Sequence, residues 1–295
     1  MVMLLPGFLY FVVFHYVPMI GIILAFKRYH VNEGIFGSAG VGFQNFDRFF
    51  GSFYASRIIT NAVFLNVLSL CIAFPMAILL ALTLNEVRSQ RFKRVVQSIT
   101  YFPYFISAVV MVGVVRMLLD VDTTTGVVNQ IRISLFHLQP LDFVSQPGLF
   151  RPIYISMVIW QTTGFSAIIY LASLAAVDVQ LYEAAIIDGA NRFQLILHIS
   201  LPALAATIVI LLLLSIGSLM KTGIETILAF YSPAIYSTAD VIETFVYRRG
   251  IVGDQSLPPD YSFATAVGLF QSLVGLILIV IANTVARRLT DRGLW

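Results

Sequence analysis

Charged residues are scarce in this 295-residue sequence: Asp, Glu, Lys and Arg together make up 11% of the chain, against 59% hydrophobic residues. A typical soluble domain carries about 25% charged residues. The scarcity excludes an ordinary soluble enzyme or binding domain and indicates a polytopic membrane protein. The few basic residues are spread over separate loops and form no stripe, so no nucleic-acid partner is expected.

Cysteine and the sequence motifs of catalysis are also missing or nearly so. Cys71 is the only cysteine, which excludes a disulfide framework or a thiolate metal site within the chain. Metal-ligand spacing is absent among His15, His30, His137 and His198. The sequence contains no GxxxxGK[ST], HExxH or GxSxG motif. We therefore expect no catalytic site, metal or cofactor in this chain, so any ATP chemistry must belong to another polypeptide.

What the sequence has instead is long apolar runs. Crossing about 30 Å of hydrocarbon takes roughly 20 helical residues. Six runs are long enough, and we expect spans at about residues 3–26, 58–84, 98–119, 152–175, 203–220 and 263–286. The first run has no basic residue before it and no small-residue cleavage site after it. It is therefore expected to serve as a membrane anchor and not as a cleaved signal peptide.

The distribution of basic residues predicts the orientation. Lys and Arg are denser in residues 86–97, 178–201 and 287–295 than in the remaining loops. These basic residues are Arg88, Arg91, Lys93, Arg94, Arg192, Arg287, Arg288 and Arg292. Because short cytoplasmic loops are enriched in Lys and Arg, we expect both termini to lie in the cytoplasm.

One inter-span segment is unusual for so apolar a protein. Residues 182–204 read YEAAIIDGANRFQLILHISLPAL, with small residues and carboxylates beside bulky aliphatics. Gly189 interrupts the helix-forming residues and Pro202 follows them, which predicts a helix, a turn and a second helix that ends before the proline. Such a short helical segment can lie in a groove of a partner while its apolar side packs against the membrane helices.

This segment resembles the EAA loop of binding-protein-dependent ABC importer permeases. The family pattern is E-A-A, three residues, G, nine residues, then I-x-L-P. It is matched by Glu183, Ala184, Ala185, Gly189, Ile199, Leu201 and Pro202. The similarity extends to LLPGFLYF near the start, GFQNFDRFF, ITYFPYFISAVVMVGVVRMLL and a terminal GLW. These stretches resemble the carbohydrate branch, of oligosaccharide and polysaccharide type, with bacterial alginate importers as one candidate.

The resemblance implies an all-α membrane protein of six transmembrane helices, with a cytoplasmic EAA-type coupling loop (residues 178–202) between the fourth and fifth. It implies a bacterial inner-membrane permease that pairs with a second homologous permease and a dimeric ATPase, which binds ATP and Mg²⁺. A solute-binding protein would deliver an oligosaccharide from outside. The coupling residues implied are Glu183, Ala184, Ala185, Asp188 and Gly189, with Glu183 meeting a basic residue of the ATPase.

Polar residues inside the expected spans are candidates for lining a sugar path. Such residues usually face the bundle interior or a water-filled cavity. They are Asn61, Asn66, Tyr101, Tyr104, Trp160, Gln161, Thr162, Thr163 and Ser166. Sugars suit this mixture, because aromatic rings stack on apolar sugar faces while amides and hydroxyls bind sugar hydroxyls. The alternative is structural, since polar side chains also join helices and aromatics form interfacial belts.

Two cations lie near the expected outer ends of spans. Arg116 and Lys221 could offset the charge of an anionic sugar at the mouth of the path. Snorkelling to the membrane interface is the simpler interpretation of both.

Two other classes of membrane protein remain as alternatives. An ion-gradient-driven transporter or channel would need a membrane-buried carboxylate for coupling, and none lies centrally in the six spans. A polytopic membrane enzyme would need a nucleophile and a base at one depth, and no such pair is evident.

Overall fold

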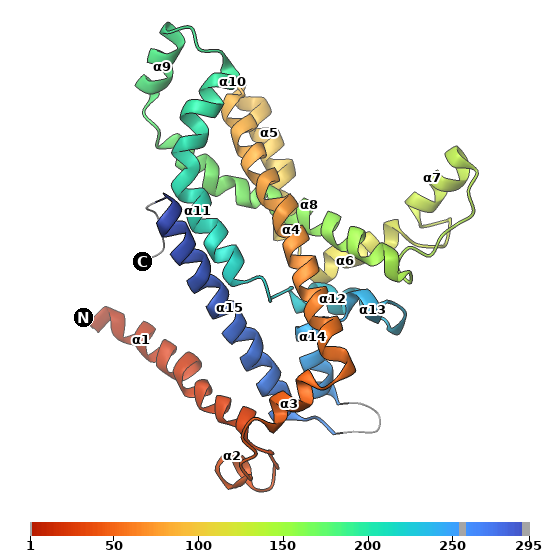
Figure 1. The fold of residues 1–295 in the computed structure, drawn as a ribbon. Helices are drawn as coiled ribbons and strands as arrows, with labels where there is room; N and C mark the ends of the chain where they lie inside the picture. Colours follow the sequence, from red (N-terminus) through yellow and green to blue (C-terminus); the bar gives the residue numbers. More distant parts are fainter. Residues whose placement is uncertain (1, 254–257, 291–295) are drawn as a thin grey trace.

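The computed structural model describes residues 2–253 and 258–290, and over these residues the protein is helical with no strand (Figure 1). Arg292 and the terminal GLW lie outside the described residues. In chain order the helical elements are η1 Val2–Leu4, α1 Leu5–Phe11, η2 Val12–Tyr16, η3 Val17–Phe26, α2 Gly34–Gly37, α3 Gln44–Phe50, α4 Phe53–Glu86, α5 Gln90–Tyr101, η4 Phe102–Phe105, α6 Ala108–Leu118, α7 Val127–Phe136, α8 Pro147–Ala175, α9 Val179–Ile187, α10 Arg192–Leu195, η5 Ile196–Ser200, α11 Leu201–Gly217, α12 Ile224–Phe230, η6 Pro233–Ile235, α13 Tyr236–Ala239, α14 Ile242–Tyr247, η7 Arg248–Val252 and α15 Tyr261–Thr290.

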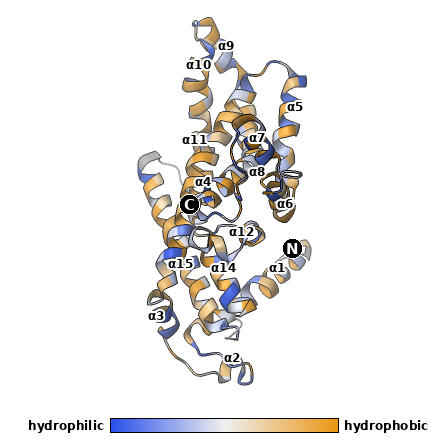
Figure 2. Cartoon of the chain, turned by 90° about the vertical axis from the view of Figure 1, so that its right-hand side faces the viewer, coloured by the Kyte–Doolittle hydropathy of each residue, from blue (hydrophilic) through white to orange (hydrophobic). Residues whose placement is uncertain are grey.

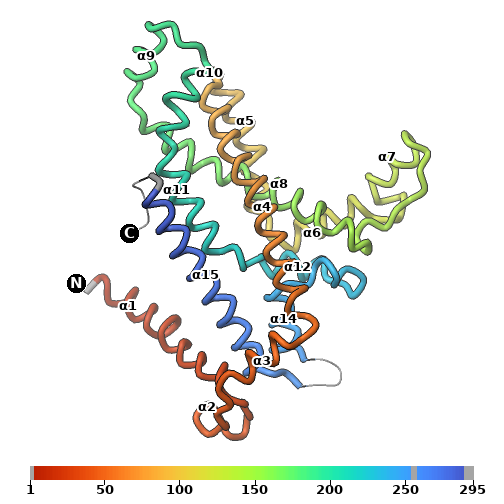
Figure 3. Tube along the Cα trace, viewed as in Figure 1, coloured from red at the N-terminus to blue at the C-terminus, as the bar shows by residue number. Residues whose placement is uncertain are grey.

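Five of the expected spans are single long apolar helices. They cover Leu5–Phe26, Phe53–Glu86, Pro147–Ala175, Arg192–Gly217 and Tyr261–Arg288. Figure 2, which colours each residue by its hydropathy, shows that these helices consist mainly of hydrophobic residues. Helices α9 and α10 lie at one end of the bundle, and α2 and α3 lie at the opposite end (Figure 3).

The third expected span, residues 98–119, is not one straight helix. It is formed by two helical segments, Gln90–Phe105 and Ala108–Leu118, that meet at 104°. Pro103 lies in the short η4 turn before the bend, Ile106 is extended, and the side chain of Ser107 caps α6 by accepting from the Val110 N–H. Proline removes a helical hydrogen bond, so the chain can turn here, and the six-span expectation holds only when the bent pair is counted as one span.

The prediction that the loop's second helix ends before Pro202 is wrong. Helix runs unbroken from Arg192 to Gly217, with Pro202 in the first turn of α11. The turn before it, η5, is a π-helix (Ile196–Ser200). A π-turn shifts the hydrogen-bond register by one residue, and such register changes accommodate breaks in the helical ladder without ending the helix.

Two buried clusters hold the bundle together. The larger includes Phe49, Ile58, Met111 and Phe245, and joins α3, α4, α6, α8 and the segments from α12 to α15. The smaller joins α4, α8 and α11 around Ala77, Ala81, Ala167, Tyr170 and Leu204 nearer the α9 end. The N-terminal part of the first span instead leans away from the bundle while η3 packs against α15, and only 6% of the span's apolar window is buried within the chain (Figure 1).

Candidate functional site

The segment between α8 and α11 forms a rigid helix-turn-helix. Asp178 caps α9 by accepting from the Gln180 N–H at 2.9 Å. The helix ends at Ile187 with Asp188 as its cap, and the next residue, Gly189, has a φ of 84°, a left-handed conformation that glycine adopts without a steric penalty. The Ala190 N–H donates to the Ala185 carbonyl at 2.9 Å and the Gly189 N–H to the Ile186 carbonyl at 3.0 Å. This pair of bonds is a Schellman motif, which explains why a glycine stands at this position.

The second half of the segment is fixed just as firmly. Asn191 and Gln194 form a reciprocal capping box at the start of α10, with bonds of 2.8 and 2.9 Å. The Tyr182 hydroxyl lies 3.0 Å from the Ser200 hydroxyl and ties α9 to the beginning of α11. Movement of α9 would therefore be transmitted directly to the fifth span.

Most of the predicted coupling residues face outward. Glu183, Ala184, Asp188 and Gly189 are exposed, and Ala185 is half-buried. No residue of α9 is buried within the chain, and the apolar side chain of Ile187 is 86% exposed. Such an exposed apolar helix is typical of a surface that another molecule covers.

A groove of about 490 Å³ runs between α4, α8 and α11. It brings together three of the predicted path residues, Asn66, Thr162 and Ser166. Its further polar lining, which the sequence analysis did not single out, comprises Ser69, Tyr170, Ser215 and Ser218. On α8 these lining residues recur every fourth position, so one helix face carries hydroxyls at 162, 166 and 170. That spacing is the sequence signal that could have found Tyr170.

Asn61 does not line the groove. Its side chain is buried, with 2% of the residue exposed, and its amide donates to the carbonyls of Ser237 at 3.1 Å and Asp240 at 3.0 Å. Its Oδ1 accepts from Arg151 at 2.8 Å. The amide therefore joins α4 to α8 and α13. This is a structural role, the alternative to lining a sugar path that the sequence left open for polar residues in spans.

The aromatic and amide candidates of α5, η4 and α8 also lie outside the groove lining. Trp160 is 51% exposed. Gln161 donates to the Ile106 carbonyl at 3.0 Å and so supports the bend in the third span. Tyr104 stacks on Phe165 with ring centroids 3.8 Å apart. Tyr101 is half-buried, and the buried hydroxyl of Thr163 has no hydrogen-bond partner among the described residues.

The two candidate cations are both exposed but lie in different places. Arg116 is close to the loop before α8, where hydrogen bonds from Ser145 and, more weakly, the charge of Arg116 lower the pKa of Asp142. Lys221 follows α11 and lines a separate groove of about 260 Å³ with Gln271. The structure therefore does not bring these two residues to one site.

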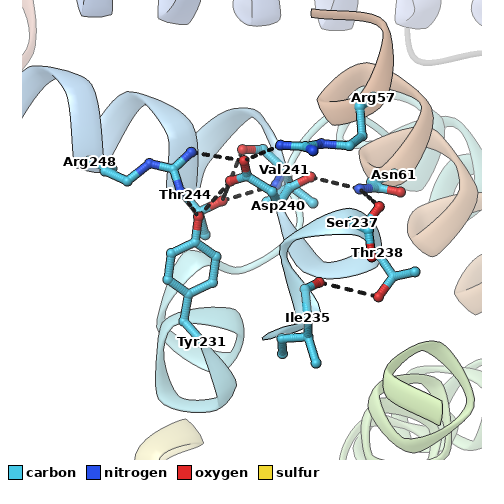
Figure 4. Close-up of polar contacts among 10 residues, drawn as sticks. All are labelled: Arg57, Asn61, Tyr231, Ile235, Ser237, Thr238, Asp240, Val241, Thr244 and Arg248. Carbon is cyan, nitrogen blue, oxygen red and sulfur yellow. Dashed lines mark hydrogen bonds and ion pairs between the residues drawn. The ribbon is translucent and has the colours of Figure 1, made fainter. Parts of the chain in front are cut away.

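A buried ion-pair cluster that the sequence analysis missed lies between α4, α13 and α14 (Figure 4). Asp240 is fully buried, and its Oδ2 lies 2.9 Å from Arg248 Nη2 and 3.5 Å from Arg57 Nη2. Its Oδ1 accepts from the hydroxyls of Tyr231 at 2.6 Å and Thr244 at 3.0 Å. Burial, and next the hydrogen bond with Asp240, raise the pKa of Tyr231, so its hydroxyl remains a donor at neutral pH.

This cluster locks the segments after α11 onto the bundle. Asn61 is bonded to the backbone of Asp240, and Thr238 donates to the Pro147 carbonyl at 2.9 Å. Nothing in the sequence pattern pairs residues 57 and 240, since they are distant in the chain and each could equally be a solvated loop charge.

Comparison with known proteins identifies the architecture. Residues 73–292 match the family of binding-protein-dependent transport system inner membrane components. The chain belongs to this family. As a member it is a transmembrane permease subunit of an ATP-driven importer, and the family is one of permeases, not enzymes.

The permease has well-matched relatives over its whole length. It is 42% identical to Protein LplB of Bacillus subtilis (strain 168), covering 99% of this chain and 90% of that protein. It is also 42% identical to the polygalacturonan/rhamnogalacturonan transport system permease protein YteP of the same organism, over 99% and 89% of the two chains.

The fold has a close counterpart among solved structures. The permease superposes on a chain from the crystal structure of a bacterial alginate ABC transporter in complex with an alginate pentasaccharide-bound periplasmic protein. The TM-score is 0.88 at 42% identity, covering 99% of this chain and 95% of that one. The all-helical permease fold, the membrane location and the resemblance noted in the sequence are thereby confirmed.

Proposed function

We propose that this permease imports acidic oligosaccharides across the bacterial inner membrane, together with a second homologous permease and a dimeric ATPase. The observation that carries the saccharide part of the proposal is the groove between α4, α8 and α11, whose wall sets several hydroxyls and the amide of Asn66 among apolar side chains. A sugar offers hydroxyls and apolar ring faces, so this wall matches its chemistry. The groove is half of a path that the second permease completes.

The acidic class of substrate is supported by the relatives. The two named for their substrates at 42% identity serve polygalacturonan or rhamnogalacturonan and alginate. Polygalacturonan and alginate are chains of uronic acids, each with a carboxylate. A permease named for arabino-oligosaccharides, which are neutral, is only 25% identical.

Coupling to ATP is assigned to α9. Glu183, Ala184, Ala185, Asp188 and Gly189 form the docking surface, and Glu183 pairs with a basic residue of the ATPase. The ATPase subunits bind ATP and Mg²⁺, and their closure moves α9. Motion passes through the Tyr182–Ser200 contact and the unbroken helix from Arg192 to Gly217. A solute-binding protein delivers the sugar from the side of the bundle opposite α9, and both termini lie in the cytoplasm.

The coupling assignment is tested in the reconstituted importer. The permease is co-purified with its partner permease and ATPase, and ATP hydrolysis is measured with and without the binding protein and sugar. Glu183→Ala combined with Gly189→Pro should abolish the stimulation of hydrolysis and the transport. Retention of full transport would contradict the docking role of α9. Gly148→Ala, at a position with open space around it, is the matched control.

The substrate class is tested by transport of two sugars of equal length. Proteoliposomes containing the complex, with binding protein outside, should accumulate tetragalacturonate in preference to a neutral galactose tetrasaccharide. Equal or greater uptake of the neutral sugar would contradict the acidic assignment.

Orientation is tested with tags at either end. A protease added to sealed right-side-out vesicles should leave an N-terminal and a C-terminal epitope intact, and should cut both after the membrane is permeabilised. Cleavage of either tag in sealed vesicles would contradict the cytoplasmic placement of that end.

A further inference from the structure

The groove between α4, α8 and α11 has no cation, among its described lining residues, to bind the carboxylates of an acidic substrate. None of its described lining residues is charged. A carboxylate transferred into a weakly polar site without a partner incurs a large desolvation penalty. If the substrate is acidic, as proposed above, the described lining of this chain's part of the groove offers its carboxylates no cation, so a charged contact from this chain has to come from another surface.

A second pocket, of about 860 Å³, lies at the end of the bundle opposite α9. Its walls come from the segment that follows the first span, from α3, from the start of α4, from α14 and η7, and from the start of α15 with the residues that precede it. Small-molecule sites typically measure about 300 to 1,000 Å³. The pocket is therefore large enough for a saccharide and is separate from the groove, with which it shares no lining residue.

Hydrogen bonds fix the walls of this pocket. The buried amide of Asn45 donates to the carbonyls of Ala25 at 2.9 Å and Lys27 at 3.0 Å, which holds α3 against the first span. The backbone N–H of Tyr29 donates to the Ser262 hydroxyl at 2.9 Å. These bonds link three distant parts of the chain, so the lining side chains are presented from a preorganised frame.

The charge of the lining is positive. Arg28, Arg48 and Arg249 line the pocket, and Asp260 is the only carboxylate among its described lining residues. Asp260 is already paired with Arg48, at 3.1 Å between Oδ2 and Nη2. Arg28 donates to the neutral Gln44 amide at 3.1 Å. An anion entering the pocket would thus meet more guanidinium charge than the lining carboxylate neutralises.

Aromatic rings stand among these cations. Tyr29 and Tyr54 line the pocket, and the guanidinium of Arg48 lies 5.1 Å from the ring centroid of Phe263. Guanidinium groups bind carboxylates through paired N–H donors, and tyrosine rings pack on the apolar faces of sugars. One pocket therefore offers both kinds of contact that a uronic acid residue needs.

We propose that this pocket is a carboxylate-binding saccharide site, which takes a uronate segment of the substrate before it enters the groove. Arg28 and Arg249 bind the carboxylate, and Tyr29 and Tyr54 pack on the ring. Arg48 remains held by Asp260 and sets the shape of the wall. The proposal rests on the acidic substrate class but assigns a different surface from the groove.

The test is direct binding of tetragalacturonate to the purified complex of both permeases and the ATPase, without binding protein, by titration calorimetry. Arg28→Gln and Arg249→Gln should each weaken binding by about tenfold, as expected for loss of a charged hydrogen bond. Arg28→Lys should fall between Arg28→Gln and the unmodified protein, because it keeps the charge but loses the paired donors. Higher salt should also weaken binding.

Arg132→Gln, which removes a cation from α7 outside the pocket, is the matched control and should bind as the unmodified protein does. Unchanged tetragalacturonate affinity in both pocket variants would overturn the site while leaving acidic-sugar import intact. The proposed site would also be overturned if the variants bound tetragalacturonate normally and weakened only the docking of the binding protein. Failure of the unmodified importer to bind or transport any oligouronate would instead overturn the proposed substrate class, and the site with it.

Discussion

At the scale of single residues, a polar side chain inside a span has two different uses in this permease. Asn61 and Asn66 lie on the same helix and look alike in the sequence, yet only Asn66 lines the groove. The side-chain amide of Asn61 makes three hydrogen bonds that join α4 to its neighbours. Sequence alone could name both as candidates but could not separate them, because the partners of Asn61 lie far away in the chain.

The difference predicts opposite effects of one substitution. Asn61→Leu should lower the free energy of unfolding by about 1 to 3 kcal/mol, since it leaves buried carbonyls and a guanidinium without their partner, with little change in the KM of transport. Asn66→Leu should raise that KM by roughly tenfold and leave stability almost unchanged, because it removes one polar group from the groove wall. Thermal unfolding and uptake assays on both variants distinguish the two roles. A raised KM for Asn61→Leu with normal stability would contradict the assignment.

The buried carboxylate of Asp240 gives a second prediction at this scale. Asp240→Asn should lower the free energy of unfolding by about 3 kcal/mol, because two arginines whose side chains are 28% and 25% exposed lose their counter-ion. Thermal unfolding followed by tryptophan fluorescence measures the loss. Asp47→Asn, on the exposed surface of α3, is the control and should unfold as the unmodified protein does. Equal stability of the two variants would show that the cluster contributes nothing net.

At the scale of elements, apolar length predicts which segments are helical but not how each helix bends. Five spans are single helices, as their run lengths indicate, whereas the third turns by 104° after Pro103. Pro75 lies inside α4 without interrupting it. At the bend after Pro103, the side chain of Gln161 from the neighbouring α8 donates to the Ile106 carbonyl. A tertiary contact of this kind has no signature in the local sequence.

The close approach of α5 and α8 is likewise set by one glycine. A Cβ placed on Gly164 would lie 2.0 Å from the Thr100 carbonyl oxygen, so Gly164→Ala must push the two helices apart. We expect a loss of about 1 to 3 kcal/mol in unfolding free energy from overpacking. Gly268→Ala, where nothing lies within 4 Å, should be neutral or slightly stabilising because alanine favours the helix. Equal melting temperatures for the two variants would contradict this packing.

At the scale of the whole molecule, the chain buries little of its own apolar surface. Between 6% and 28% of the apolar window of each long span is buried inside it. The rest must be covered by lipid or by partner subunits such as the second permease proposed above, or must line a path that contains water. The helix and glycine turn of the proposed coupling loop could be predicted from the sequence because they are local and contiguous, whereas the coupling role itself stays a prediction. Only part of the groove lining could be predicted from the sequence, because its wall is assembled from three helices that are distant in the chain.

The groove and the lipid-facing surface are chemically distinguishable in the assembled importer. In a Cys71→Ala background, a water-soluble methanethiosulfonate should label Ser69→Cys and Ser215→Cys, which line the groove, at least about tenfold faster than Ile281→Cys, an exposed apolar site on α15. The reagent reacts with the thiolate, which forms in water and is suppressed in an apolar surrounding. Labelling of the two groove positions should change when ATP is added, because alternating access closes one side of the path as it opens the other. Equal labelling rates at all three positions would mean that the groove faces lipid and is not part of the path.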